Sequence, residues 1–407
     1  MMNEKWEEQF REQIHGFVET IEKFDKGEID RKAYKGISGG FGSYAQHDPS
    51  KHMLRLRMAG GNLTEKRLEF LTEAVRDYGV ELMKLTTCET VQLHNLKAEQ
   101  VPVLMEKAIA SEIYSRGGGG DNPRNIMMSP LSGVQKGEAF DVKPYAEAAA
   151  EYLLSIAGEI HLPRKLKVAF SNGADDSVHS AFRDMGFMAN PDGTFTLRIA
   201  GGLGGYKMGI LVDEHVQTTE ILYYIRAMIE TFCQHGNYEN RAKARTRFMQ
   251  ETLGTDGLKE AFLENVAKVK EKGGLDLHVE AKPVTKKGSG EISGKRVVAQ
   301  KQPGLYAVAY HPIGGCLPAG KPAELLTLVR EIPDAECRIA PYETIYIINL
   351  TADEAKKVLE ATNDGAQSTF ENSVACIGAA ICQQGVRDSL AALRAAVEAV
   401  RESGIPD

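Results

Sequence analysis

The chain has 407 residues, of which 43% are hydrophobic and 26% charged, and its formal net charge at pH 7 is −7. This length predicts two or three domains with packed cores, and the negative charge gives no basic field for nucleic acid. The six cysteines are too few for a disulfide framework, the N-terminus lacks the apolar core of a signal peptide, and no apolar run is long enough for a membrane span. We therefore expect a cytoplasmic protein with no nucleic-acid or membrane partner.

The N-terminal part of the chain begins with an amphipathic helix over residues 4–25, in which apolar residues recur every three or four positions. A glycine-rich stretch then leads into a strand, 53–58, whose alternation places Arg55 and Arg57 on one face and apolar residues on the other. Strand and helix patterns alternate after it in the order of half a split βαβ, ferredoxin-like unit. They are expected at residues 53–58, 64–78, 82–94 and 98–110.

The same pattern recurs near the C-terminus without a gap. Residues 89–98 (ETVQLHNLKA) match residues 343–352 (ETIYIINLTA), so that 254 positions separate each residue from its counterpart. A repeat of this length is not a solenoid. It indicates two half-modules whose strands pair into one pseudo-symmetric domain.

A different unit lies between the two copies. It contains a glycine-rich loop, 117–125, and a strand, 162–170, in which Lys165 and Lys167 share a face. The other elements predicted here are a helix at 143–157, a hairpin turn at 190–193, a glycine loop at 200–205, and helices at 215–235 and 239–252. Residues 270–303 are rich in Lys, Gly and Glu and are typical of a linker or a mobile hairpin.

Two sets of side chains are candidates for chemistry. Cys376 and Cys382, six positions apart, are either buried free thiols or ligands of a soft metal or an iron–sulfur cluster. The other cysteines are interpreted as buried thiols. Five cations stand on strands or beside glycine loops; each alone is typical of a solvated surface charge, but together they predict an anion pocket. They are Arg55, Arg57, Arg124, Lys165 and Lys167.

Five segments of the chain resemble, in the same order, those of the sirohaem-dependent sulfite and nitrite reductases. They are residues 53–61 (MLRLRMAGG), 121–125 (DNPRN), 162–167 (LPRKLK), 240–247, and the C-x5-C pair at 376 and 382. The resemblance covers nearly the whole chain and includes the duplicated half-modules.

The resemblance implies a sirohaem that shares a cysteine with a [4Fe–4S] cluster and a six-electron reduction of a small oxyanion, with electrons from ferredoxin or a flavoprotein. The catalytic residues implied are Arg57, Arg124, Lys165 and Lys167. The cofactor-binding residues implied are Arg55, Arg57, Arg124, Asn125 and Lys165. Cys376 and Cys382 would be the first two cluster ligands.

The chain departs from the family pattern in three places. Thr87-Cys88-Glu89 stands where the family usually has Thr-Arg-Gln, and His47 replaces a common arginine. The second cysteine pair of the family, C-x3-C, would follow beyond Asp407, so two of the four expected cluster ligands are absent from this chain.

The resemblance therefore predicts a C-terminally truncated member of the family. A second lysine, Lys167, favours sulfite reduction to sulfide. Nitrite reduction to ammonia by the same fold is one alternative, and a non-catalytic fragment that cannot complete the cluster is another.

The fold class expected is α/β (α+β). Duplicated ferredoxin-like half-modules form a pseudo-two-fold domain beside a sirohaem-binding α/β domain, whose second copy is incomplete. The predicted units are an N-terminal helix and arm (1–47), half-module 1 (48–112), the sirohaem- and substrate-binding domain (113–268), a linker (269–303), half-module 2 (304–366) and the start of a second sirohaem and cluster domain (367–407).

Overall fold

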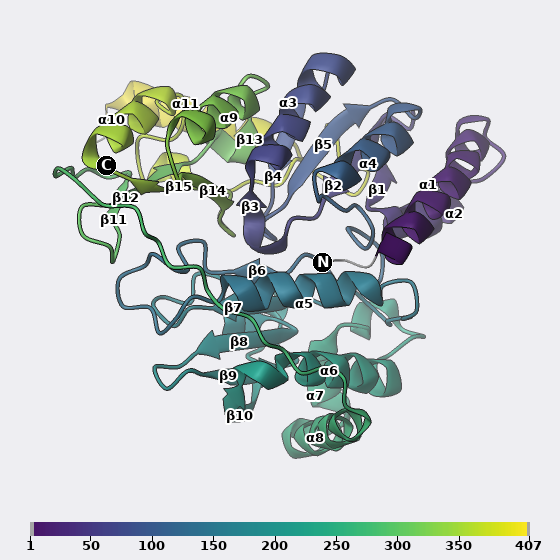
Figure 1. Cartoon of the computed structure of the whole chain (residues 1–407). Helices are drawn as coiled ribbons and strands as arrows, with labels where there is room; N and C mark the ends of the chain where they lie inside the picture. Colours follow the sequence, from purple (N-terminus) through teal and green to yellow (C-terminus); the bar gives the residue numbers. More distant parts are fainter. Residues whose placement is uncertain (1–3, 405–407) are drawn as a thin grey trace.

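The computed structural model of the chain describes residues 4–404 and contains three five-stranded sheets (Figure 1). The outer ends of the first and last predicted units, residues 1–3 and 405–407, lie outside the described residues. None of the helices in the described part has the length and apolar character needed to cross a membrane. The result is a mixed α/β fold, as the sequence predicts.

The first sheet belongs mainly to half-module 1 and is antiparallel throughout, in the order β1-β2-β5-β4-β13. Its strands are β1 (Ser43–Ala45), β2 (His52–Leu56), β4 (Leu82–Leu85), β5 (Val91–Leu96) and β13 (Cys316–Leu317). The helices of this region are α1 (Glu4–Asp25), α2 (Arg31–Ser38), α3 (Glu65–Tyr78) and α4 (Gln100–Ala110). Their apolar faces share one buried core with the sheet, as the amphipathic patterns predict.

The second sheet belongs mainly to half-module 2 and has the corresponding order, β11-β12-β15-β14-β3. Its strands are β3 (Asn62–Leu63), β11 (Val297–Ala299), β12 (Tyr306–Tyr310), β14 (Glu336–Ile339) and β15 (Ile345–Leu350). Its helices are α9 (Lys321–Glu331) and α10 (Ala352–Ala361), followed by α11 (Ser389–Ser403).

The two half-modules exchange a short strand. β3 leaves the first copy and pairs with β14, and β13 leaves the second copy and pairs with β4. Each strand of the first copy begins 254 residues before its counterpart. The glycine turns also match, since Gly60 and Gly314 have φ of 56° and 60°, a left-handed conformation that glycine adopts at little cost. The predicted pairing of the two copies into one pseudo-symmetric body is therefore present in the structure.

The third sheet lies below the other two in Figure 1, in the order β10-β9-β8-β7-β6. β6 and β8 flank β7 in parallel, whereas the hairpin β8–β9 and the pair β9–β10 are antiparallel. Its strands are β6 (Met127–Met128), β7 (Val168–Ser171), β8 (Met185–Ala189), β9 (Thr194–Ile199) and β10 (Ile210–Gln217). Its helices are α5 (Lys143–Ser155), α6 (Ile221–His235), α7 (Met249–Thr252) and α8 (Gly254–Lys272).

Two predicted strands are wrong in extent. The single strand expected at 82–94 is the hairpin β4–β5, because Glu89 has a φ of 56° that a strand cannot contain. The strand expected at 162–170 begins only at Val168. Before it, the backbone makes an isolated bridge from Leu166 to Pro123, and the Lys167 N–H donates to the Asp184 carboxylate at 2.8 Å.

The predicted helices at 215–235 and 239–252 are also partly wrong. The first begins at Ile221, after strand β10. Most of the second consists of short 3₁₀ turns, because the Asn240 side chain accepts from a nearby backbone N–H and Thr246 donates to Asp184. Such local side-chain bonds compete with a continuous helix.

Residues 273–296 contain neither helix nor strand and cross from α8 to β11 (Figure 1). Leu277 N–H donates to the Thr219 carbonyl at 2.9 Å, and Lys286 forms an ion pair with Glu354 at 2.8 Å. β11 lies inside the range predicted as a linker. The exact boundaries of the predicted units stay a prediction.

Candidate functional site

Basic side chains from three separate segments line one cavity of about 230 Å³, here named the cation cavity. Two of the arginines lie in β2 and directly after it, and the glycine-rich loop supplies the third arginine. Both lysines lie in the segment before β7. The turn between β4 and β5 closes the cavity with Thr86, Thr87, Cys88 and Thr90. The five cations are those predicted from the sequence, Arg55, Arg57, Arg124, Lys165 and Lys167.

Backbone carbonyls hold the three arginines in place. Arg55 donates to the Gly118 carbonyl at 2.6 Å, and Arg124 donates to the same carbonyl and to that of Gly120. Arg57 donates to the carbonyls of Arg116 at 2.8 Å and Arg124 at 3.1 Å. The glycine-rich loop therefore orients the cations without neutralising them.

Glycine is needed where this loop approaches the arginines. Gly117 has a φ of 70°, and a Cβ there would lie 2.8 Å from an Arg57 guanidinium nitrogen. A side chain at this position would be strained and would displace Arg57. The glycine at position 117 therefore allows the backbone of the loop to lie close to the Arg57 guanidinium.

Within residues 4–404, no carboxylate forms an ion pair or hydrogen bond with any of the five cations. The nearby carboxylates already have other partners: Asp121 bonds Arg164 and Arg241, and Asp184 bonds Arg245. The cavity therefore keeps a positive charge that a bound anion can compensate.

Burial and repulsion between neighbouring cations lower the pKa values of Arg57, Arg124 and Lys165. Burial, with repulsion from Arg124, lowers the pKa of Arg57 to about 9, and burial lowers that of Arg124 to about 10. Burial and the neighbouring Arg124 and Lys167 lower the pKa of Lys165 to about 8. Lys165 is thus protonated at neutral pH yet close to releasing a proton, as a proton donor requires.

Asn125 lines the cation cavity but has a structural role as well. Its side-chain oxygen accepts from Met58 N–H at 3.0 Å, and its amide donates to the Cys88 carbonyl at 3.0 Å and to that of Glu89. The side chain is 3% exposed. Asn125 therefore fixes the end of β2 against the turn that carries Cys88.

The predicted cysteine ligands lie in a neighbouring cavity of about 260 Å³, the cysteine cavity. Cys376 is exposed and Cys382 half-buried, and both line this space. Arg55 and Gln92 line both the cysteine cavity and the cation cavity, so the two predicted sites are adjacent. Among the described residues, no group of three or more His, Cys, Asp or Glu is arranged to hold a metal ion.

A third cavity of about 410 Å³, the outer cavity, shares Thr87 and Lys167 with the cation cavity. It adds three arginines that the sequence reasoning did not propose as site residues, Arg183, Arg245 and Arg247. The last two lie in segment 240–247, which the resemblance includes, so a signal for them was present. Tyr342 of half-module 2 also lines the outer cavity, which no sequence pattern indicated.

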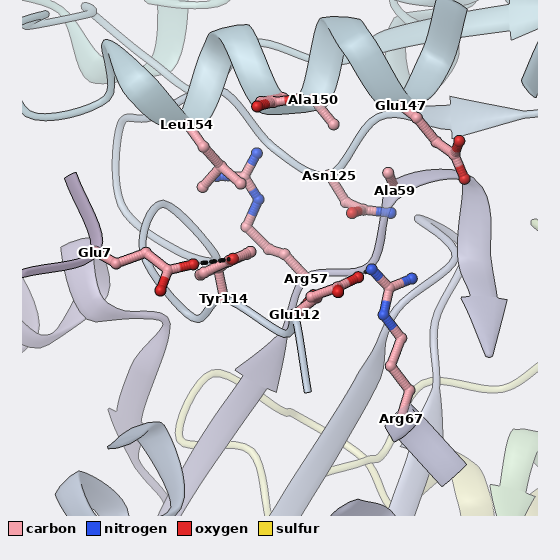
Figure 2. Close-up of a pocket in the computed structure, with 11 residues that line it drawn as sticks. Glu7, Arg57, Ala59, Arg67, Glu112, Tyr114, Asn125, Glu147, Ala150 and Leu154 are labelled. Atoms are coloured by element: carbon pink, nitrogen blue, oxygen red, sulfur yellow. Dashed lines mark hydrogen bonds between the residues drawn. The ribbon is translucent and has the colours of Figure 1, made fainter. Parts of the chain in front are cut away.

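A fourth cavity, of about 530 Å³, is lined by acidic side chains and is shown in Figure 2. Four carboxylates line this acidic cavity, and Tyr114 donates to one of them at 2.7 Å. They are Glu7, Glu112, Glu147 and Glu151. Arg57 and Asn125 line both the acidic cavity and the cation cavity. Since carboxylates repel oxyanions, the cation cavity is the better candidate anion site.

His94 and His311 lie outside the cation cavity. His94 lines the cysteine cavity and is near Gln46 and Gln92, and His311 is buried beside Thr344, at 3.0 Å. Of the four cysteines interpreted as buried thiols, Cys337 is buried, whereas Cys88, Cys233 and Cys316 are half-buried. Cys88 in addition lines the cation cavity.

Two family models match the chain. "Nitrite/Sulfite reductase ferredoxin-like half domain" matches residues 44–111, and "Nitrite and sulphite reductase 4Fe-4S domain" matches residues 119–270. Together they cover more than half of the chain, including four of the five segments that carry the sequence resemblance.

Curated relatives and a solved structure agree with these matches. The chain is 26% identical over 404 residues to the chloroplastic ferredoxin–nitrite reductase of Arabidopsis thaliana, covering 95% of this chain and 67% of the relative. It is 25% identical over 411 residues to the assimilatory ferredoxin-dependent nitrite reductase of Haloferax mediterranei, covering 94% and 70%. The structure of the Mycobacterium tuberculosis NirA protein has the same fold, with a TM-score of 0.77 and 23% identity over 99% of this chain and 77% of that one. This chain thus spans about two thirds of the length of these relatives.

Proposed function

The chain belongs to the nitrite and sulfite reductase family, and on that premise we propose that its cation cavity binds nitrite for a six-electron reduction to ammonium at a sirohaem. The observation that carries the proposal is a cavity with five cations and no carboxylate partner among the described residues. The names of the relatives favour nitrite over sulfite, the substrate that Lys167 favoured in the sequence. Sulfite remains the second candidate because Lys167 does line the cavity.

The residues present fit a sirohaem by charge. Sirohaem carries many carboxylates, and the cation cavity and outer cavity together present arginines and lysines with few acidic neighbours. The Nε atoms of Arg57 and Arg124 are also buried without an acceptor, which is the condition that a bound carboxylate or oxyanion would relieve. When bound, sirohaem supplies the iron at which the oxyanion is reduced.

The residues present do not complete an iron–sulfur cluster. A [4Fe–4S] cluster takes four thiolates, and the cysteine cavity offers Cys376 and Cys382. Within the described residues, this cavity would therefore supply two of the four ligands that a cluster needs.

The protein groups perform binding and proton transfer. Arg57, Arg124 and Lys167 donate hydrogen bonds to the oxyanion and stabilise the negative charge that develops as oxygen leaves. Lys165 Nζ, with its lowered pKa, donates a proton to the departing oxygen. Electrons come from ferredoxin in the relatives named above, and we propose ferredoxin as the donor here, with a flavoprotein as the alternative.

The test uses the full chain produced in cells that make sirohaem and iron–sulfur clusters. Absorption spectra and iron content report bound cofactor, and consumption of nitrite and of sulfite is followed with reduced methyl viologen. We expect nitrite to be consumed faster than sulfite. Lys165→Ala should lower the rate by about 10²- to 10⁴-fold while the absorption spectrum is kept.

Lys282→Ala, at an exposed lysine of the long segment 273–296, is the matched control and should leave the rate unchanged. Full activity of Lys165→Ala would contradict the assignment of the cation cavity. A purified chain with neither tetrapyrrole absorption nor iron would instead favour the non-catalytic alternative.

A further inference from the structure

Cys88 is held at the wall of the cation cavity by the turn between β4 and β5. Its N–H donates to Thr86 Oγ1 at 3.3 Å, and its carbonyl accepts from the Asn125 amide at 3.0 Å. Lys167 lines the same cavity, and its positive charge favours the thiolate form of Cys88. The reductase function proposed above gives this thiol no role.

The cavity beside Cys88 shows independent signs of an anion site. Arg57 is 3% exposed and lines the cavity, yet its Nε has no acceptor. The Nε of Arg124 is likewise buried and unpaired. Buried donors are rarely left without a partner, so these arginines point to an anionic ligand close to the thiol.

The charges around Cys88 favour its thiolate form, unlike the surroundings of Cys316 and Cys337. Burial alone would raise its pKa, but Lys167, Arg183 and Arg55 outweigh burial and lower the pKa to about 7. Burial raises the pKa of Cys337 to about 12 and also raises that of Cys316. The thiolate is the reactive form of cysteine, and Cys88 therefore combines a thiolate with an anion site.

We propose that Cys88 attacks thiosulfate bound in the cation cavity and takes its outer sulfur atom. The Cys88 thiolate forms a new bond to that sulfur, and the sulfur–sulfur bond of thiosulfate breaks. Sulfite departs with the bonding electron pair, and a persulfide anion remains on Cys88. Total charge is the same before and after the step, and no oxidant or reductant is consumed.

The cations of the cavity act on both ends of this reaction. Arg124 and Lys165 bind the sulfonate oxygens, and they stabilise the negative charge that collects on sulfite as it leaves. Lys167 keeps Cys88 deprotonated before the attack. The step requires neither sirohaem nor the cluster, so it goes beyond the proposed reductase function and does not depend on it.

The experiment mixes the full chain with thiosulfate and no electron donor. We expect about one equivalent of sulfite per chain, and peptide mass spectrometry should show one added sulfur atom on Cys88. Cys88→Ser should release no sulfite, whereas Cys316→Ser, at a half-buried cysteine outside the cation cavity, should behave as the parent. Lys167→Met should slow sulfite release about tenfold at pH 7, because it removes the main charge that favours the thiolate.

Two control measurements test whether the Cys88→Ser variant folds and whether the Cys88 thiol is accessible in the parent. Circular dichroism of Cys88→Ser establishes that the variant folds, and iodoacetamide labelling of the parent tests whether the thiol is accessible. The proposal is overturned if iodoacetamide fails to label Cys88, if Cys88 proves accessible to iodoacetamide but gains no sulfur when the unlabelled chain is mixed with thiosulfate, or if Cys88→Ser releases as much sulfite as the parent. Because the assay lacks an electron donor, its failure leaves the reductase proposal untouched.

Discussion

The two half-modules have matching backbones but place different chemistry on them. Arg57 and Cys88 of the first copy, which line the cation cavity, correspond by the 254-residue offset to His311 and Tyr342 of the second. His311 is buried against Thr344, and Tyr342 bonds Tyr346 at 2.8 Å. The cation cavity is thus a property of one copy only.

The two copies share the side chains whose hydrogen bonds hold the backbone in place. In the first copy, Gln46 exchanges two hydrogen bonds with Asn95, and in the second Gln300 exchanges the same two with Asn349. Both asparagines have a positive φ. The comparison shows that turn and strand-pairing residues maintain the module, while positions that face the cavities are free to carry charge.

The largest effect is expected where the copies exchange strands. Lys84 of the first copy forms an ion pair with Glu343 of the second, and both are buried. Lys84→Met would leave the Glu343 carboxylate buried and unpaired, and should lower the free energy of unfolding by about 3–5 kcal/mol in urea titrations.

The matched control is Glu89→Gln, at the position in the first copy that corresponds to Glu343. Burial raises the pKa of Glu89 well above its usual value and so favours the neutral carboxyl. Because an amide resembles a neutral carboxyl in shape and polarity, Glu89→Gln should cost less than about 1 kcal/mol. Equal losses in Lys84→Met and Glu89→Gln would show that the two copies do not differ here.

Arg57→His gives the first copy the residue of the second. The variant removes a charged donor from the cation cavity, and sulfite affinity, measured by calorimetry, should fall about 10- to 100-fold. His311→Gln changes the equivalent site in the second copy and should leave that affinity unaltered. Unchanged affinity in Arg57→His would mean that Arg57 does not contact the bound anion.

The pH dependence of nitrite binding tests Lys165, for which the described chain has no counterpart in the second copy. Its lowered pKa, about 8, means that the lysine loses its charge as pH rises through 8. In a Cys88→Ser background, which removes the titration of the thiol, nitrite affinity should fall about three- to tenfold between pH 7 and 9. Lys165→Met should bind nitrite more weakly than the parent at pH 7 and should lose less affinity between pH 7 and 9. Its remaining fall reflects Arg57, whose pKa burial lowers to about 9. An equally large fall in both proteins would assign the titration to a group other than Lys165.

A smaller loss of stability than that of Lys84→Met is expected at the glycine turns, where the copies are alike. Gly60→Ala and Gly314→Ala place a side chain at positive φ, and each should cost about 1–2 kcal/mol in the free energy of unfolding. Gly257→Ala, inside α8 and without a close neighbour, should instead stabilise by about 0.5–1 kcal/mol. If Gly60→Ala and Gly314→Ala lower the free energy of unfolding by clearly different amounts, the two glycine turns are not equivalent.

The sequence alone determined the duplicated module, its offset and the five cations of the cavity. These features are local or repeated: strand alternation placed Arg55 and Arg57 together, and the match of residues 89–98 to 343–352 revealed the second copy. The α1 helix has the bounds that its apolar period predicts. The predicted role of each site residue stays a prediction, but the cations do line one cavity.

Tertiary structure decided the features that depend on contacts between distant segments. The left-handed Glu89 splits one expected strand into β4 and β5, and bonds to Asp184 convert most of an expected helix into short turns. The strand exchange through β3 and β13 pairs residues hundreds of positions apart, which no local pattern encodes. Cys88 has the sequence context of an ordinary buried thiol. Its character follows from Lys167 and Arg183, because charge acts through space and a sequence pattern records only neighbours along the chain.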